Sequence, residues 1–186
     1  MNLTINQILK QGNTAQQEGK SEEAEHFYRE ILKTQPTHPD ANHNLGVVAV
    51  SKNRTLEALS LFKIATEANP NSEQFWISYG NVLINEKKYK EAEKSFKKVI
   101  ELNPYNARAH NIRGTIVQIL GKLDEAEVSY KKAIELEPDY VNSHCKLGVV
   151  LDDLGKFDEA EKSYRKAIEL KPDYVEALTN LAGTMV

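Results

Sequence analysis

Hydrophobic and small residues recur along this chain in a pattern that predicts pairs of amphipathic helices. One unit spans residues 142–174, and its first apolar set falls at i, i+3, i+4 and i+7, the spacing of one helix face: His144, Leu147, Gly148 and Leu151. The pattern breaks at Gly155, because glycine readily ends a helix in the left-handed conformation. A second apolar set follows: Ala160, Tyr164, Ala167 and Ile168. Pro172 then stops the second helix, since its ring clashes with the preceding turn.

The same unit returns every 34 residues. Four columns keep this period: Gly12, Gly46, Gly80, Gly114 and Gly148; Ala24, Ala58, Ala92, Ala126 and Ala160; Pro36, Pro70, Pro104, Pro138 and Pro172; and the aromatic column Tyr28, Phe62, Phe96, Tyr130 and Tyr164. A fixed period of this length marks a solenoid of stacked units that bury their core between neighbours. We therefore predict one all-α solenoid domain over residues 1–186, with repeats at residues 5–38, 39–72, 73–106, 107–140 and 141–174 and a partial repeat at 175–186.

The small columns have a packing reason. We expect Gly148 and Ala160 to lie where the two helices of a hairpin come closest, and Tyr164 to fill the space between one hairpin and the next. Thr4 followed by Gln7 predicts a capping box, and Thr55 is interpreted as a second N-cap.

Charged positions belong mostly to the second helices. Their i, i+4 spacing predicts ion pairs that keep the outer wall hydrated: Glu127–Lys131, Asp158–Lys162 and Glu161–Arg165. Arg113 stands where other repeats carry leucine, and we expect its stem to be buried with its guanidinium in water.

The combination Leu147-Gly148, Ala160, Tyr164, Ala167 and Pro172 closely resembles the tetratricopeptide repeat, in length as well as residues, over nearly the whole chain. The resemblance implies a right-handed superhelix of antiparallel helix pairs. It also implies that first helices line a concave groove and second helices form the outer wall. Trp76 stands in the family's signature aromatic slot, where it is expected to wedge between helices.

Composition and charge narrow the functional classes. A net charge of −3 gives no long-range attraction for nucleic acid, and the basic residues Lys10, Arg108 and Lys146 are offset by nearby acidic ones. No stretch approaches the length needed to span a bilayer, and the N-terminus does not resemble a signal peptide. A single cysteine, Cys145, suits a reducing compartment. We predict a cytoplasmic protein that binds neither nucleic acid nor membrane.

Catalytic and metal-binding patterns are missing from the sequence. The segment 114–122 superficially resembles a phosphate loop, but its glycines are repeat residues and no Ser or Thr follows Lys122. His110 and His144 share one repeat position and are expected to lie too far apart to hold one metal ion. We interpret Cys145 as a small groove or packing residue. The chain is therefore predicted to be no enzyme and to need no cofactor.

The remaining candidate site is the predicted groove. On the fifth repeat its face comprises Asn142, Cys145, Lys146, Val149, Asp152 and Asp153, and equivalent positions elsewhere are rich in asparagine and glutamine. An amide side chain both donates and accepts hydrogen bonds, so it can pair with a peptide backbone whatever the partner's sequence. The candidate peptide-binding residues are Asn13, Asn44, Asn81, Asn111, Asn142 and Lys146. A solvated surface is the plainer interpretation of any single asparagine.

Two binding modes of the family can be compared with these positions. Asn44-Leu45-Gly46 and Asn180-Leu181-Ala182 resemble the asparagine ladder in the superhelical arm of O-linked N-acetylglucosamine transferases, although Lys10, Ser78, Ile112 and Lys146 interrupt it. The carboxylate clamp of chaperone-binding members is not expected. Its cationic positions are taken here by Leu9, Gln74 and Ser78.

Three functional hypotheses follow. The first is a non-catalytic scaffold that binds a peptide or protein partner in the groove, with Asn44, Asn81 and Asn111 as the residues to test. The alternative is a substrate-recruiting arm of a larger enzyme, resembling a glycosyltransferase, sulfotransferase or methyltransferase, with its catalytic domain beyond residue 186. The third is weak self-association through the partial repeat, at Leu181 and Met185.

Overall fold

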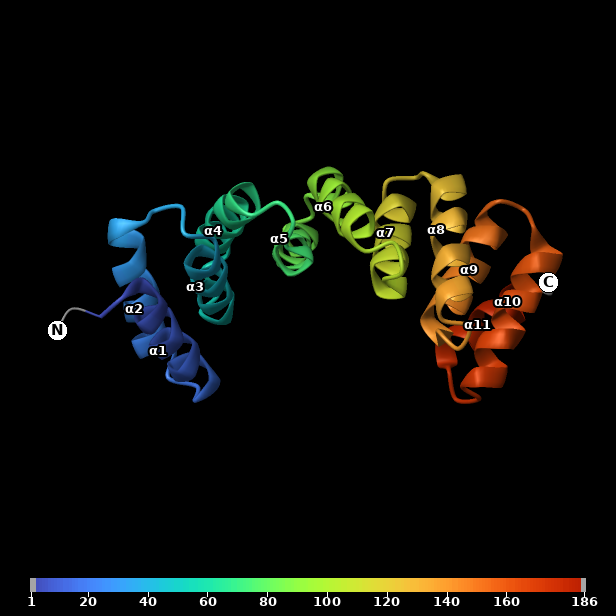
Figure 1. Ribbon diagram of the computed structural model, residues 1–186. Helices are drawn as coiled ribbons and strands as arrows, with labels where there is room; N and C mark the ends of the chain where they lie inside the picture. Colours follow the sequence, from blue (N-terminus) through green and yellow to red (C-terminus); the bar gives the residue numbers. More distant parts are fainter. Residues whose placement is uncertain (1–2, 185–186) are drawn as a thin grey trace. The chain divides into compact units, whose positions relative to one another are not determined.

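The computed structural model describes residues 3–184 and is all-α, which confirms the predicted fold class. Eleven helices and no strand occur in these residues (Figure 1). The helices are α1 Ile5–Gln17, α2 Ser21–Thr34, α3 Pro39–Ser51, α4 Thr55–Ala68, α5 Glu73–Asn85, α6 Tyr89–Leu102, α7 Ala107–Ile119, α8 Leu123–Leu136, α9 Val141–Asp153, α10 Phe157–Leu170 and α11 Val175–Thr184.

The helix lengths explain the 34-residue period. In each of the five full repeats the first helix has 13 residues and the second has 14, and two short connectors complete the unit. The odd-numbered helices begin at Ile5, Pro39, Glu73, Ala107, Val141 and Val175, the first residues of the repeats derived from the sequence. The proline and glycine columns therefore fall at the same place in the backbone of every repeat.

The connector inside each hairpin needs one residue in the left-handed region. Gly19, Gly121 and Gly155 supply it with φ of 75°, 75° and 74°, and Asn53 and Lys87 supply it with φ of 57°. Gly155 thus ends its helix as predicted. Lys87 shows that the turn forms even with a side chain that disfavours this conformation.

Two helix starts were predicted from their caps, and one prediction is wrong. Thr4 and Gln7 form the expected capping box. Thr55 is instead the first residue of α4, and the cap position belongs to Arg54, which makes no side-chain cap bond. A side-chain N-cap needs a non-helical backbone. The tight turn at Asn53 starts the helix too early for Thr55 to serve as one.

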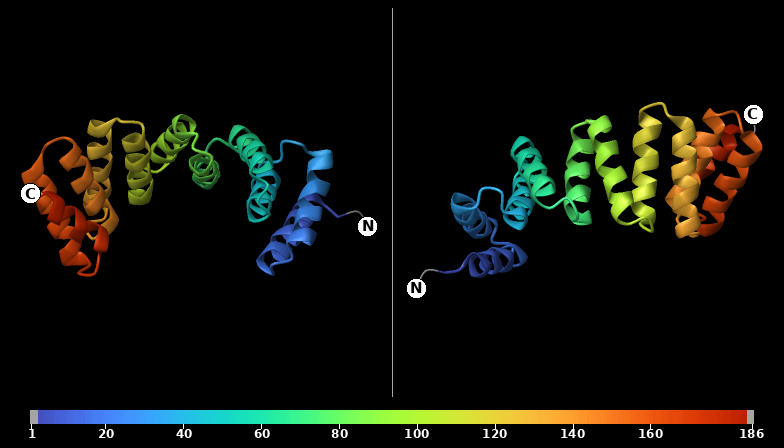
Figure 2. Two further views of the ribbon diagram at one scale, coloured as in Figure 1. Left: turned by 180° about the vertical axis from the view of Figure 1, so that it is seen from behind. Right: turned by 45° about the horizontal axis from the view of Figure 1, so that its top comes forward.

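The chain divides into two compact units, one up to Lys87 and one from Lys88 on. In the first unit α1, α2 and α3 bury two apolar clusters: Ala15, Ala24, Tyr28, Leu45 and Val48, and Ile8, Ile31 and Ala41. In the second unit α7 to α11 pack side by side (Figure 2) around a core that includes Tyr130, Cys145, Leu151, Tyr164 and Ala177. In both units the apolar residues join each hairpin to the next.

Four glycines of the column are required by a close approach inside their hairpins. A Cβ atom on Gly12 would lie 2.6 Å from the ring of Tyr28, and one on Gly148 would lie 2.5 Å from the ring of Tyr164. A Cβ atom on Gly46 would lie 2.7 Å from the ring of Phe62, and one on Gly114 would lie 2.7 Å from the ring of Tyr130. The aromatic residue thus lies over the glycine of its own hairpin, a contact within the repeat that the sequence interpretation did not include.

Candidate functional site

One position near the start of the first helix bonds back to the connector that precedes it. Four repeats show this bond, from Asn42, Trp76, His110 and His144. In all four repeats the side chain bonds to the carbonyl of the proline six residues earlier, at 2.8–3.0 Å. A carbonyl only accepts, so Nε2 of His110 and of His144 carries the proton. The two histidines are therefore structural residues, as the sequence suggested for this position.

Tyrosine hydroxyl groups connect the core to the inner face of the hairpins. Tyr28 donates to Asn13 Oδ1 at 2.9 Å and to Gln16 Oε1 at 2.7 Å. The equivalent Tyr130 donates to Gln118 Oε1 at 3.0 Å, and Tyr164 donates to Asp152 Oδ2 at 2.8 Å. Burial raises the pKa of Tyr28 to about 12, so the hydroxyl stays protonated and remains a donor.

Sequence reasoning missed this coupling, although a signal for it is present. The residue twelve positions before each tyrosine of the aromatic column is Gln16, Gln118 or Asp152, and before the two phenylalanines it is Val50 or Ile84. A hydroxyl needs a polar neighbour where a phenyl ring does not. Comparing the two columns repeat by repeat would have predicted the hydrogen bonds.

In the first unit the candidate residues form a bonded row across first helices. The amide nitrogen of Asn44 in α3 donates to Asn13 Oδ1 in α1 at 2.9 Å, and both residues are half-buried. His43 continues the row to α5, because its Nε2 lies 3.0 Å from Ser78 Oγ. Asn81 lies further along α5 and is exposed. The row is thus continuous from α1 to α5.

His43 is the most buried member of this row. Its ring stacks on Phe75 at a centroid distance of 4.6 Å, and its Nδ1 lies 3.0 Å from Asn44 Oδ1. Burial lowers the pKa of His43 below its ordinary value. The neutral ring therefore fixes the orientation of the Asn44 amide.

In the second unit the candidates differ in accessibility. Asn111 is buried, with 8% of its surface exposed, and its Oδ1 accepts a hydrogen bond from Ser143 Oγ at 2.9 Å. Asn142 is half-buried, and its amide nitrogen lies 3.5 Å from the Tyr174 hydroxyl. Lys146 is paired with Glu176 of α11 at 2.8 Å. Asn111 therefore bonds α7 to α9, while Asn142 and Lys146 keep surface open to a partner.

Two interpretations from the sequence are corrected here. Cys145 was placed on the groove face and interpreted as a groove or packing residue; it is fully buried in the core, so the packing alternative holds, and burial raises the pKa of its thiol to about 11. Arg113 was expected to hold its guanidinium in water. Instead it donates to Ser129 Oγ at 2.7 Å and pairs with Glu125 on α8. The guanidinium of Arg113 therefore finds its partners on α8 and not in water.

Ion pairs join neighbouring repeats as well as successive helical turns. Glu25, Glu93 and Glu127 share one repeat position, and each pairs with the basic residue 29 positions later: Arg54 at 2.6 Å, Lys122 at 3.0 Å and Lys156 at 2.7 Å. Of the predicted i, i+4 pairs, Glu127–Lys131 and Glu161–Arg165 form at 2.6 Å and 2.5 Å. No ion pair between Asp158 and Lys162 occurs within the described residues. The second helices therefore carry ion pairs to the connector of the next hairpin as well as within themselves.

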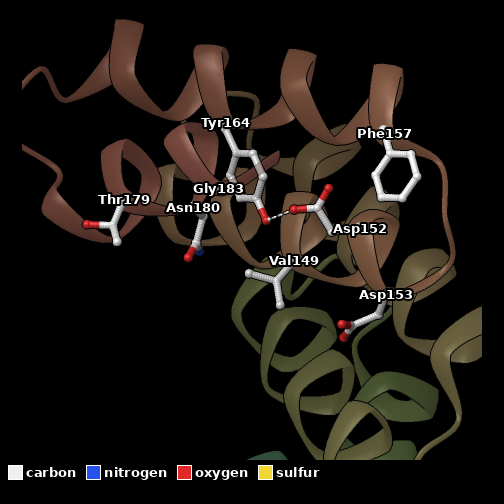
Figure 3. Close-up of a pocket in the computed structure, with 8 residues that line it drawn as sticks. All are labelled: Val149, Asp152, Asp153, Phe157, Tyr164, Thr179, Asn180 and Gly183. Carbon is white, nitrogen blue, oxygen red and sulfur yellow. Dashed lines mark hydrogen bonds between the residues drawn. The ribbon is translucent and has the colours of Figure 1, made fainter. Parts of the chain in front are cut away.

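A hollow opens in the second unit. It has a volume of about 620 Å³ and is lined by three helices: Val149, Asp152 and Asp153 of α9, Phe157 and Tyr164 of α10, and Thr179, Asn180 and Gly183 of α11 (Figure 3). The Tyr164–Asp152 hydrogen bond crosses its floor. We call this feature the α9–α11 hollow.

Leu181 and Met185 were named for self-association. Leu181 is half-buried against the core of the second unit, and Met185 lies outside the described residues. No helix within residues 3–184 is both long and apolar enough to cross a membrane. Over the same residues no cluster of three or more His, Cys, Asp or Glu side chains is arranged to hold a metal ion.

The hairpins, the glycine–ring contact and the polar first-helix faces define a helical repeat protein. Four family models described as tetratricopeptide repeats match residues 9–73, 73–106, 119–154 and 141–174, together well over half of the chain. The chain therefore belongs to the tetratricopeptide repeat family, as its sequence pattern suggested. No curated protein matches the sequence.

Solved structures show the same fold. YrrB, whose structure is described as a TPR protein with an unusual peptide-binding site, matches with a TM-score of 0.88 at 24% identity over 95% of this chain and 91% of its own. A MamA protein matches with a TM-score of 0.82 at 21% identity, over 92% of this chain and 94% of its own. MamA from Desulfovibrio magneticus RS-1 matches at 0.81 and 21% identity, over 94% and 98%. These similarities establish the fold alone.

Proposed function

We propose that this protein is a non-catalytic scaffold whose first helices bind an extended segment of a partner protein. The observation that carries the proposal is the polar row that crosses the first unit from Asn13 through Asn44 to Ser78. Amide groups held by such bonds are oriented before a partner arrives, so less side-chain entropy is lost on binding. They also keep further donor or acceptor capacity for a peptide backbone.

The six candidate residues have different roles in this proposal. Asn13, Asn44 and Asn81 contact the peptide in the first unit, and Asn142 and Lys146 do so in the second. Asn111 is too buried to reach far and instead holds α9 against α7 through Ser143. The similarity to YrrB, which is described as having a peptide-binding site, supports the same class of function.

The test is direct binding of a displayed library of short random peptides. The triple variant Asn44→Ala, Asn81→Ala, Asn142→Ala should retain its helical circular dichroism and lose about tenfold or more in affinity for peptides selected on the wild type, since each lost amide bond contributes about 1 kcal/mol. Asn111 is left intact because it is only 8% exposed and is not proposed to contact the peptide.

A matched control changes three exposed residues away from the first helices: Asn71→Ala, Lys94→Ala and Lys162→Ala. This variant should bind selected peptides like the wild type. Unchanged affinity in the Asn44, Asn81, Asn142 variant would contradict the assignment of the binding surface.

The alternative role as the substrate-recruiting arm of a larger enzyme stays a prediction, as do the right-handed superhelix and the cytoplasmic location. The asparagine-ladder mode of glycosyltransferase arms is one form that peptide binding would take. Sequencing the gene downstream of the codon for Val186 tests the enzyme alternative, because an immediate stop codon removes it.

A further inference from the structure

The α9–α11 hollow differs in chemistry from the asparagine row. Two carboxylates, Asp152 and Asp153, lie on its wall beside the ring of Phe157, which is 58% exposed (Figure 3). Val149 adds an aliphatic surface to the lining, on the side of Asp152 away from Phe157. The hollow therefore combines negative charge at one side with apolar surface for a long side-chain stem.

The backbone reinforces the negative charge. Asp152 and Asp153 are the last two residues of α9. The carbonyl groups at a helix C-terminus carry the negative end of the helix dipole, which favours a cation nearby. The two carboxylates and the carbonyl groups at this end of α9 thus both favour a bound cation.

Nearby cations are already matched to other carboxylates. Lys146 pairs with Glu176 at 2.8 Å, and Lys156 pairs with Glu127 at 2.7 Å. No ion pair reaches the exposed Asp153 from within residues 3–184. Tyr164 donates to Asp152 and so fixes the direction of that carboxylate without supplying positive charge. Asp153 therefore brings to the wall of the hollow a negative charge that a ligand cation would complement.

We propose that the α9–α11 hollow receives a lysine or arginine side chain of the bound segment. The ammonium or guanidinium group meets Asp152 and Asp153, the stem lies along Val149, and the cation or its stem contacts the exposed face of Phe157. Asn180 of α11 also lines the hollow and holds the adjacent backbone of the segment. This inference rests on the proposed peptide-binding function and names the residue type that the second unit selects.

The experiment uses the full chain and a displayed library of short random peptides. Peptides selected on the wild type should carry Lys or Arg at one position, enriched about fivefold or more over the unselected library. Substitution of that residue by alanine in a synthetic peptide should weaken binding about tenfold, the change expected for one charge-assisted contact. Lysine and arginine versions of that peptide show which cation is preferred.

The protein variants test the carboxylates. Asp152→Asn with Asp153→Asn keeps an acceptor for Tyr164 but should abolish the preference for basic residues. Asp153→Lys should reverse it toward Asp or Glu. Asp139→Asn, an exposed position in the turn before α9, removes one negative charge outside the hollow and should leave the preference unchanged.

The outcomes separate the two proposals. If the wild type captures no peptide, the proposed function fails and this inference fails with it. If the wild type captures peptides without basic enrichment, or if the Asp152→Asn, Asp153→Asn variant keeps that enrichment, this inference alone is overturned.

Discussion

The first two hairpins place different aromatic residues at the same point of the same backbone. Tyr28 of the α1–α2 hairpin lies over Gly12, and Phe62 of the α3–α4 hairpin lies over Gly46, with almost equal spacing. Both rings are buried. The hairpins differ in what surrounds the ring edge: Tyr28 bonds to Gln16, whereas the equivalent neighbour of Phe62 is Val50, which is 42% exposed.

The comparison separates what all hairpins share from what each one varies. The ring–glycine contact sets the distance between the two helices and is common to both. The hydroxyl and its partner decide whether the inner face above the ring is polar or apolar. A second difference lies on the second helices, where Glu25 of α2 pairs with three cations and the equivalent Leu59 of α4 is a buried apolar residue.

The largest loss of stability is expected from placing a methyl group between the glycine and the aromatic ring. Gly46→Ala places a methyl group 2.7 Å from the Phe62 ring, which is too close for any real contact. The hairpin must open or the ring must move, and overpacking of this kind costs about 2–3 kcal/mol. Urea unfolding followed by circular dichroism measures the loss.

Gly183→Ala is the matched control for that substitution, because no atom lies within 4 Å of the added Cβ. It should leave stability unchanged or raise it by up to ~1 kcal/mol, since alanine favours a helix over glycine. Equal midpoints for the Gly46 and Gly183 variants would show that the ring contact does not set the helix spacing.

A smaller loss of stability is expected from Glu25→Gln, which removes the negative charge that pairs with three cations. Leu59, at the equivalent position, carries no charge. Arg54 donates to both carboxylate oxygens of Glu25, and Lys52 and Arg29 also donate to it. Losing these charge-assisted bonds should cost about 2 kcal/mol at pH 7. Glu22→Gln serves as control, because Glu22 also pairs with Lys52 but its side chain is 90% exposed.

The same variant has a defined pH dependence. Arg54, followed by the other basic partners, holds the pKa of Glu25 well below its ordinary value of 4.5. A lowered folded-state pKa gives stability that is fully present above about pH 4.5 and decreases as the pH falls below it. The difference in urea midpoint between wild type and Glu25→Gln should therefore shrink from pH 5 to pH 3, taken as a window around that value. A constant difference would mean that Glu25 acts only through packing.

The smallest effect on stability is expected from adding or removing the hydroxyl group at the edge of the aromatic ring. Tyr28→Phe removes bonds to Asn13 and Gln16, and since both acceptors are half-buried and keep some access to water, we expect a loss of about 1 kcal/mol. Phe62→Tyr should also cost about 1 kcal/mol, because its hydroxyl meets Val50, and adding Val50→Gln should recover that loss. A double-mutant cycle of Phe62 and Val50 measures the coupling, and a value near zero would break the comparison.

The period, the helix starts and the glycine column could be derived from the sequence because they depend on local and recurring features. Proline and the left-handed connector residue fix where helices end, and five copies average out exceptions such as Lys87. The row from Asn13 to Asn44 was also predicted as one surface. Spacing on a helix is enough to identify residues that share a face.

Asn111, Cys145 and Arg113 were harder to place, since each belongs to a boundary between the inner face and the contact with the next hairpin. How far such a residue is buried depends on the angle between neighbouring helices, which helical periodicity does not contain. The Tyr164–Asp152 bond has the same origin, because it joins residues on two helices whose approach is set by Gly148.

The amino-acid sequence by itself determined the family, the helical hairpins and the side of each first helix that carries asparagine. Only the tertiary structure decided which of those polar residues form hydrogen bonds between helices and which remain accessible to a partner. It also decided that two carboxylates and an exposed phenyl ring line one hollow. The physical reason is that backbone conformation responds to neighbours along the chain, whereas burial and charge balance depend on helices that meet in space.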